Sequence, residues 1–344
     1  WQTAALPAML KATYAAYHKD PFFNPIPKLV YAIHNISYQG RFPEDQWPIL
    51  SLPRSYYTYD FEFYGQINLT KSAIHLADAI TTVSDTYARE IQTTDFGFGL
   101  QETLQARKED LYGILNGVDY QQWSPETDPY TYGIHYSADD LSGKRRIKSK
   151  LRAEYQLPDS DDLPLIGMTT RFVEQKGIDL ITECAEKILQ LDTQMIVLGS
   201  GEPRYHDFFE WLRRSYPDRV GIYIGFNNEL AHRIEAGADI FLMPSLFEPC
   251  GLNQIYSLKY GTLPIVRLTG GLADTIEDGV NGFTFFDFTV HYFFDAAQRA
   301  IEVYRKHPDR WKQMMITAMG QDFSWEKSAE KYLAVYTQAL EKNE

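Results

Sequence analysis

The sequence predicts an α/β protein with two doubly wound domains, of which the first is incomplete. Three observations support this fold class. The chain has 344 residues, more than twice the length of a typical single domain. From about Leu163 onward, short β-branched or apolar runs alternate with amphipathic stretches of helical length. Before Leu163 the same alternation is present, but with fewer candidate strands.

The second half contains enough strands for a complete parallel sheet. The expected strands are Leu165–Thr169, Gln194–Leu198, Val220–Ile224, Ile240–Met243 and Pro264–Arg267. The expected helices are Gly177–Gln190, Tyr205–Ser215, Glu229–Glu235 and Leu252–Lys259, each ended by polar residues, Gly or Pro. The preceding stretch, 116–162, is rich in Pro, Asp, Tyr and Ser and is expected to be a connector with one helix at Lys144–Tyr155.

The first half has three expected strands, which are too few for a parallel sheet covered on both faces. The strands are Leu29–Ile33, Ile80–Val83 and Tyr112–Leu115, and the helices are Thr3–Tyr17, Gln66–Leu76 and Thr86–Ile91. The chain begins at Trp1 rather than Met, so we expect the opening strands of this domain to lie upstream. Alone, such a domain would leave apolar strand faces and a sheet edge uncovered, which favours aggregation.

Helices without strands are expected after Asp287. Val290, Phe293, Ala297, Ile301 and Tyr304 form one apolar stripe at helical spacing, and Trp325, Ala329, Tyr332, Tyr336 and Leu340 form another. Both stripes indicate packing faces. We therefore expect a first domain over residues 1–118, a second over 119–324, and a terminal helix over 325–344 that packs on the first domain.

Composition excludes several classes of protein. The formal net charge of −13 argues against nucleic acid or an anionic membrane as a partner, so a bound phosphate needs a local cluster of cations. Cys184 and Cys250 have no metal-binding spacing and cannot form a disulfide framework, which indicates a reducing compartment. No apolar run approaches the length of a membrane span, and no signal peptide opens the sequence.

The segment Ser245-Leu-Phe-Glu-Pro-Cys-Gly-Leu-Asn-Gln follows an expected strand and precedes a helix. In open α/β sheets, ligands bind at the carboxyl ends of strands, where Gly251 and the next helix N-terminus could present N–H groups. Glu248, before Pro249, would be held rigidly at the mouth of such a site. The alternative is an acid in a surface loop.

Three further candidate segments lie at the carboxyl ends of expected strands. Arg171 and Lys176 can converge on one phosphate, with Gly177 allowing close backbone approach, unless they form a solvated basic pair. Thr269-Gly-Gly opens a helix and is a weaker candidate anion cradle. His34 and Asn35 end a strand in the first half, where a purely structural histidine is the alternative.

Common cofactor and hydrolase motifs are absent from the sequence. No GxGxxG follows a strand, and no Walker A loop, HExxH or GxSxG occurs. The run Asp159-Ser-Asp-Asp could mimic a metal-binding DxD motif, but it precedes a strand and is expected to be a solvated loop.

Seven motifs in order closely resemble bacterial glycogen synthases and plant starch synthases. They are His34-Asn-Ile-Ser-Tyr-Gln-Gly, Thr82-Val-Ser-Asp-Thr-Tyr-Ala, Gly113-Ile-Leu-Asn-Gly-Val-Asp with Trp123-Ser-Pro-Glu-Thr-Asp, Thr170-Arg-Phe-Val-Glu-Gln-Lys-Gly, Phe247-Glu-Pro-Cys-Gly-Leu, Lys259-Tyr-Gly-Thr-Leu-Pro-Ile-Val-Arg and Thr269-Gly-Gly-Leu-Ala-Asp-Thr. The resemblance covers essentially the whole chain. It implies the GT-B fold, in which two Rossmann-like domains face a central cleft. That family opens with an upstream Lys-x-Gly-Gly-Leu loop that this sequence lacks.

The resemblance implies transfer of glucose from ADP-glucose to the non-reducing end of an α-1,4-glucan, with retention of configuration and without a metal or other cofactor. It implies that Arg171 and Lys176 stabilise the leaving phosphate, Glu248 holds sugar hydroxyls and His34 contacts the transferred glucose. The implied donor-binding residues are Asn35, Asn116, Phe226 (stacked on adenine), Cys250, Gly251, Leu252, Gly270, Gly271 and Leu272. Tyr256 stands where related retaining families have a second acid, so no covalent nucleophile is assigned.

Two other functions stay open from the sequence. One is a different GT-B transferase with a small-sugar acceptor, such as a sucrose synthase relative. The other is a non-catalytic glucan-binding homologue. The resemblance is compatible with the cytoplasm of a bacterium or the plastid stroma of a plant or alga, with ADP- or UDP-glucose as donor, and with any oligomeric state.

Overall fold

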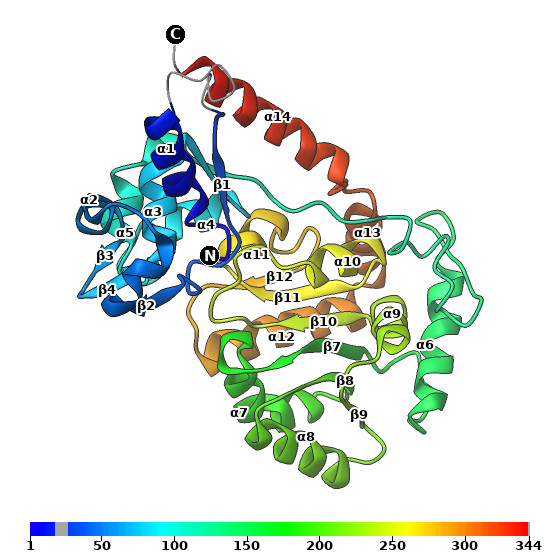
Figure 1. Cartoon of the computed structure of the whole chain (residues 1–344). Coiled ribbons are helices and arrows are strands. Elements are labelled where there is room, and N and C mark those ends of the chain that lie inside the picture. The colour runs from blue at the N-terminus through cyan, green and yellow to red at the C-terminus, as the bar shows by residue number, and fades with distance from the viewer. Residues whose placement is uncertain (18–26, 343–344) are drawn as a thin grey trace. The chain divides into compact units, whose positions relative to one another are not determined.

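The computed structural model describes residues 1–17 and 27–342, and the chain splits into two compact units (Figure 1). Unit 1 comprises Trp1–Leu115 and Ser328–Glu344, and unit 2 comprises Asn116–Lys327. Predicted domain boundaries after residues 118 and 324 lie close to these divisions.

Unit 2, all of whose residues are described, is built on a six-stranded parallel sheet with the order β12-β11-β10-β7-β8-β9. The strands are β7 (Leu165–Phe172), β8 (Gln194–Gly201), β9 (Val220–Ile224), β10 (Ile240–Met243), β11 (Leu263–Arg267) and β12 (Phe283–Phe285). The chain winds outward from β7 to β9 and then returns to start again at β10. The switch point of this doubly wound sheet therefore lies between β7 and β10.

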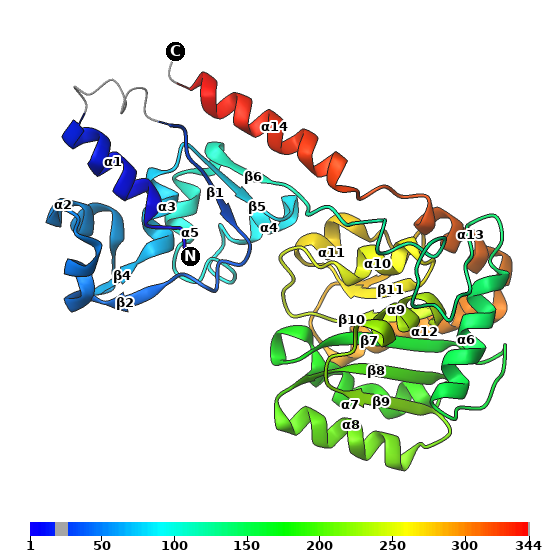
Figure 2. The same ribbon diagram turned by 45° about the vertical axis from the view of Figure 1, so that its right-hand side comes forward.

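Helices cover both faces of this sheet (Figure 2). They are α6 (Ser142–Glu154), α7 (Ile178–Leu189), α8 (Pro203–Ser215), α9 (Asn228–Gly237), α10 (Asn253–Lys259), α11 (Gly270–Thr275), α12 (Val290–Lys306) and α13 (Pro308–Met319). All four residues of β10 are buried, as expected for a parallel strand covered on both sides. The predicted apolar stripe of α12 is confirmed, because Phe293, Ala297 and Ile301 lie in the core.

Unit 1 contains two small sheets among its described residues. Strands β1 (Val30–Ile33), β5 (Ala79–Thr82) and β6 (Leu111–Gly113) form a parallel sheet in the order β1-β5-β6. Strands β2 (Arg41–Pro43), β3 (Glu62–Phe63) and β4 (Gln66–Asn68) form an antiparallel sheet in the order β2-β4-β3. The α-helices are α1 (Leu6–Tyr17), α2 (Arg54–Tyr56), α3 (Leu69–Leu76), α4 (Asp85–Glu90), α5 (Gln101–Gln105) and α14 (Trp325–Glu341). Short helices of other types are η2 (Glu44–Leu50), η3 (Tyr57–Phe61) and η4 (Lys108–Asp110) in unit 1 and η5 (Glu174–Lys176) in unit 2.

The structure corrects three sequence predictions. The second sheet has six strands rather than five, because β12 is a strand. The helix predicted at Gln66–Leu76 begins only at Leu69, since the preceding three residues form β4. The antiparallel sheet of unit 1 was not predicted at all, because its strands are only two or three residues long.

The apolar face predicted for the terminal helix was wrong at most of its positions. Of the predicted stripe, Trp325, Tyr336 and Leu340 are exposed. The buried residues of α14 are Ser328, Val335 and Ala339. Val335 and Ala339 pack with Ala79 and Ile114 of unit 1, and the half-buried Tyr332 packs against this cluster.

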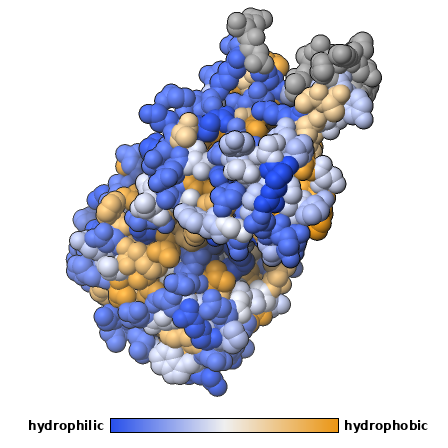
Figure 3. All heavy atoms as spheres, turned by 60° about the vertical axis from the view of Figure 1, so that its left-hand side comes forward, coloured by the Kyte–Doolittle hydropathy of each residue, from blue (hydrophilic) through white to orange (hydrophobic). Residues whose placement is uncertain are grey.

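Apolar side chains on the face shown in Figure 3 occur in patches among polar ones. Across residues 1–17 and 27–342, every helix is too short or too polar to cross a bilayer.

Candidate active site

The loops that leave β7 and β10 are bound to each other at the switch point of unit 2. The carbonyl oxygen of Gln175 accepts the N–H of Leu246 (2.9 Å), and the Gln175 amide donates to the carbonyl of Phe247 (3.2 Å). Gly177 has φ +69°, and a Cβ there would overlap the carbonyl oxygen of Pro244. This close approach requires glycine, and it fixes the two loops side by side.

These loops enclose a cavity of about 210 Å³ at the carboxyl ends of the strands. Its lining residues are Thr169, Thr170, Arg171, Lys176, Leu242, Met243, Ser245, Glu248, Gly251, Leu252 and Asn253. The structure thus brings Arg171 and Lys176, which lie on one segment, together with Glu248 from another segment. A cavity at the switch point is where ligands of doubly wound sheets bind.

Glu248 is the central acid of the cavity. Its side chain is largely buried and accepts hydrogen bonds from Lys176 Nζ (2.6 Å) and Ser245 Oγ (3.0 Å), both through Oε2. The Arg171 side chain is exposed and has no hydrogen bond or ion pair with the described residues. The Lys176 charge is therefore balanced by Glu248, while the Arg171 charge is left free for an anion.

Backbone contacts from α11 hold the Glu248 loop in place. The N–H of Gly271 donates to the carbonyl oxygens of Glu248 (3.1 Å) and Pro249 (3.2 Å). Gly270 has φ +44°, and a Cβ there would overlap the carbonyl oxygen of Glu248. Leu272 is fully buried in the core. These three residues do not line the cavity, so their structural contact is with the loop, and a direct contact with the donor stays a prediction.

The remaining predicted donor residues have different settings. Gly251 and Leu252 line the cavity. Cys250 is buried and does not line the cavity; burial raises the pKa of its thiol to about 12, and the backbone of Asn116 hydrogen-bonds to it. Phe226 follows β9 and is 90% exposed, outside the cavity lining.

His34 and Asn35 lie at the end of β1 in unit 1. They line a separate cavity of about 230 Å³ with Trp1, Tyr31 and Tyr38 among others. The Asn35 side chain accepts hydrogen bonds from the Ser37 N–H (3.0 Å) and hydroxyl (2.7 Å). His34 is exposed and has no hydrogen bond or ion pair with the described residues.

Sequence reasoning missed several residues of the site. Ser245 was quoted only as the start of a motif, yet its hydroxyl orients Glu248. The Asn253 amide donates to the carbonyl of Thr169 (2.6 Å) and joins α10 to β7. Tyr256, at the position where related families have a second acid, stacks on Trp123 with ring centroids 3.9 Å apart. Within the described residues, no three His, Cys, Asp or Glu side chains are grouped as metal ligands.

Comparison with known proteins identifies the family. Residues 1–106 match the starch synthase catalytic domain model, and residues 150–315 match glycosyl transferases group 1. The chain is 45% identical to glycogen synthase 1 of Geobacter metallireducens over 349 residues, which covers 99% of the chain and 68% of the relative. It is also 45% identical to glycogen synthase of Koribacter versatilis, covering 98% of the chain and 70% of the relative. The chain belongs to the glycogen and starch synthase family.

Solved structures agree with this assignment. The catalytic domain of starch synthase IV from Arabidopsis thaliana, bound to ADP and acarbose, has a TM-score of 0.90 and 34% identity, covering 99% of this chain and 72% of that one. Sucrose-phosphate synthase of Thermosynechococcus elongatus has a TM-score of 0.58 and 19% identity, covering 91% and 68%, and shows likeness of fold alone. The predicted α/β, GT-B fold class is confirmed.

Proposed function

We propose that this chain transfers glucose from ADP-glucose to the non-reducing end of an α-1,4-glucan, with retention of configuration. The observation that carries the proposal is the cluster of Arg171, Lys176 and Glu248 around one cavity at the switch point of unit 2. Support comes from relatives named glycogen synthase and from the likeness to a starch synthase that binds ADP and acarbose. ADP as the nucleotide and glucan as the acceptor come from these comparisons.

The chemistry of the cavity suits departure of a nucleoside diphosphate. When the bond between the glucose C1 and the phosphate oxygen breaks, negative charge develops on the distal phosphate. In this proposal Arg171 receives that phosphate first, because its guanidinium is exposed and unpaired. Lys176 joins as the charge grows, and the two cations stabilise the transition state more than the ground state.

Glu248 serves the sugar in this proposal. Its carboxylate accepts hydrogen bonds in the ligand-free geometry from Lys176 and Ser245. Sugar hydroxyls can replace the Lys176 donor at Oε2 or bind Oε1, which releases the ammonium toward the phosphate. Donor binding and rearrangement of this ion pair are therefore coupled.

The other assignments stay predictions from the family resemblance. They are adenine stacking by Phe226, glucose contact by His34 and Asn35, lining of the donor site by Asn116, and catalysis without a metal. A small-sugar acceptor has no specific support in the structure. The compartment, whether bacterial cytoplasm or plastid stroma, also stays a prediction.

The test is incorporation of labelled glucose into glycogen from ADP-glucose, with UDP-glucose as the competing donor and fructose as the competing acceptor. We expect transfer of glucose to glycogen. The substitution Arg171→Glu should abolish this transfer, and EDTA should leave it unchanged. Transfer to fructose alone would show a different transferase. Binding of ADP and glucan without any transfer would show a non-catalytic homologue.

A further inference from the structure

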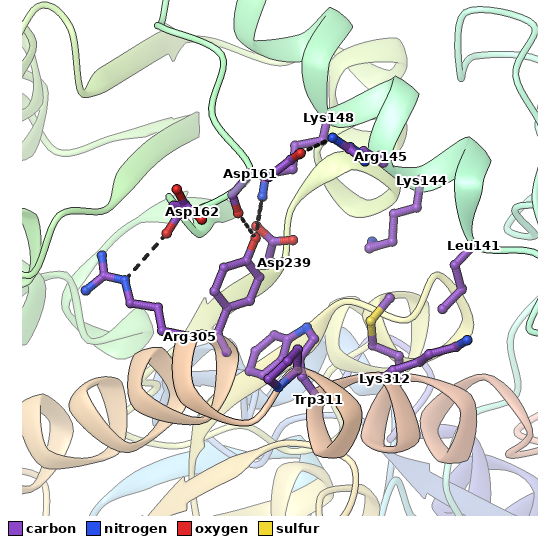
Figure 4. A pocket seen from close by; sticks show the side chains of 13 residues that line it. Leu141, Lys144, Arg145, Lys148, Asp161, Asp162, Asp239, Arg305, Trp311 and Lys312 are labelled. Carbon is purple, nitrogen blue, oxygen red and sulfur yellow. Dashed lines mark hydrogen bonds and ion pairs between the residues drawn. The ribbon is translucent and has the colours of Figure 1, made fainter.

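A second, larger cavity lies at the opposite edge of the unit 2 sheet. Its volume is about 760 Å³, within the range of small-molecule sites. Asp162 and Asp239, which line it, come just before β7 and β10, whereas the donor cavity follows those strands. Figure 4 shows that most of its other labelled side chains come from α6, α12 and α13, while Leu141 and Asp161 come from the loops before α6 and β7. The lining residues are Leu141, Lys144, Arg145, Lys148, Asp161, Asp162, Asp239, Tyr304, Arg305, Pro308, Trp311, Lys312 and Met315.

Cations exceed anions in this lining. Five basic and three acidic side chains contribute to it. Two of the acids are neutralised locally, since Asp161 pairs with Arg145 and Asp239 with Lys148 (2.6 Å). Asp162 is then the one remaining carboxylate of the lining, against Lys144, Arg305 and Lys312. In a chain of net charge −13, a local excess of positive charge favours an anionic ligand.

Lys144 is the most unusual of these cations. Its side chain is only 5% exposed, and its ammonium donates to the carbonyls of Ala236 (3.0 Å) and Tyr260 (3.1 Å) and to the Thr262 hydroxyl (2.7 Å). No carboxylate of the described residues pairs with it. Burial lowers the pKa of Lys144 to about 7. The nearby carboxylates Asp239 and Glu235 favour its charged form without pairing with it directly, and an anion in the adjacent cavity would stabilise that charge further.

Other parts of the wall suggest the form of the ligand. Lys312 is exposed and has no ion pair with the described residues, so its ammonium is available for direct contact. Pro308, the first residue of α13, lines the cavity, and no side chain caps this N-terminus. Trp311 and Tyr304 meet edge to face (5.2 Å) and give an apolar surface, and the Asp162 carboxylate can accept hydroxyl groups. Free cations beside a helix N-terminus favour phosphate, and the rest of the wall favours a hydroxylated body.

We propose that this cavity binds a small phosphate monoester that carries hydroxyl groups, at a site separate from the donor cavity. Its phosphate lies near Lys312 and the start of α13, and its hydroxyl groups lie toward Asp162. The proposal does not depend on the transferase assignment, because none of these residues belongs to the donor cavity.

The test is calorimetric titration of the whole chain with glucose 1-phosphate. It is carried out on the Arg171→Glu variant, in which the donor cavity repels phosphate. We expect saturable binding that Lys312→Glu weakens by about tenfold or more, the effect of losing one charge-assisted contact. Arg310→Glu is the matched control, because Arg310 is an exposed cation on the same helix outside this lining. It should change the affinity by less than about twofold.

Three results would overturn the proposal. They are absence of saturable binding to Arg171→Glu, equal weakening by Lys312→Glu and Arg310→Glu, and equal affinity for glucose and glucose 1-phosphate. Thermal unfolding of each variant establishes that it is folded, which we expect because neither cation has a buried contact. Glucose transfer to glycogen is measured separately on Lys312→Glu in the otherwise unchanged chain. This measurement tests the proposed function independently of ligand binding in the second cavity.

Discussion

Replacement of Glu248 by Gln should separate turnover from nucleotide binding. Lys176 Nζ lies 2.6 Å from Glu248 Oε2, and the two side chains are 18% and 8% exposed. Glutamine keeps the shape but removes the charge that neutralises Lys176. The freed ammonium can then meet the distal phosphate of ADP without first leaving a carboxylate. We therefore expect ADP to bind at least as tightly as to the unchanged chain, while turnover falls by about a hundredfold or more.

The same substitution should lower stability. Removal of one member of a buried ion pair costs about 3–5 kcal/mol, and the partial exposure of Lys176 favours the lower end. Lys176→Met paired with Glu248→Gln should cost less than the two single changes added together, because no lone charge is then buried. Urea unfolding of the four proteins measures this coupling.

Steady-state kinetics with ADP-glucose and glycogen, together with calorimetry of ADP, decide the role of Glu248. Ser245→Ala is a useful comparison, because it removes the other donor to Oε2 and leaves both charges in place. A parallel loss of ADP affinity and turnover in Glu248→Gln would refute the reasoning, since it would place Glu248 on the nucleotide side of the site.

Three further substitutions test other parts of unit 2. Arg171→Ala should lower kcat/KM by about a hundredfold, as expected for loss of one electrostatic stabiliser, and a near-normal rate would show that Arg171 is merely solvated. Phe226→Ala should raise KM for ADP-glucose with a smaller effect on kcat, because base stacking is present in ground and transition states alike; unchanged ADP affinity would mean that adenine binds elsewhere. Burial raises the pKa of Glu235 to about 8, so the folded chain holds this proton more tightly than the unfolded chain, and stability should fall as pH rises from about 4.5 toward 8. Glu235→Gln should reduce the dependence of the free energy of unfolding on pH between pH 4.5 and 7, as measured by urea unfolding. This window lies below the range in which Lys144, with a pKa lowered to about 7, contributes the opposite slope. An unchanged slope in Glu235→Gln would contradict the role of Glu235.

The long buried strands of unit 2 were predictable because their sequences are continuously apolar. β10 is buried at all four positions, and the predicted bounds match the observed ones. β12 has only three residues, too few for a periodic pattern, and was missed. Its position is instead defined by pairing with β11, a long-range contact that no local signal specifies.

Local signals were also missed in unit 1. Asn68 is the N-cap of α3, and its side chain accepts the N–H of Lys71 (3.0 Å). An asparagine at this position is a common helix start, so the predicted helix at Gln66–Leu76 could have been shortened from sequence. The face of α14 is a harder case, because the large aromatic residues dominate the apolar pattern. Ala339 and Ser328 are buried because small residues allow close packing, and a hydrophobic periodicity gives them little weight.

The active-site cluster shows the same division between local and long-range information. The sequence places Arg171 and Lys176 after one strand and Glu248 after another, each at a carboxyl end. It does not show that β7 and β10 are neighbours in the sheet, because two other strands lie between them in the chain. Adjacency of β7 and β10 joins Lys176 to Glu248 across 72 residues and makes them an ion pair. The consequence is chemical as well as architectural. Lys176 is neutralised by Glu248 in the ligand-free site and becomes available to the phosphate only when the sugar also binds. ADP alone should therefore separate this ion pair less effectively than the complete nucleotide sugar.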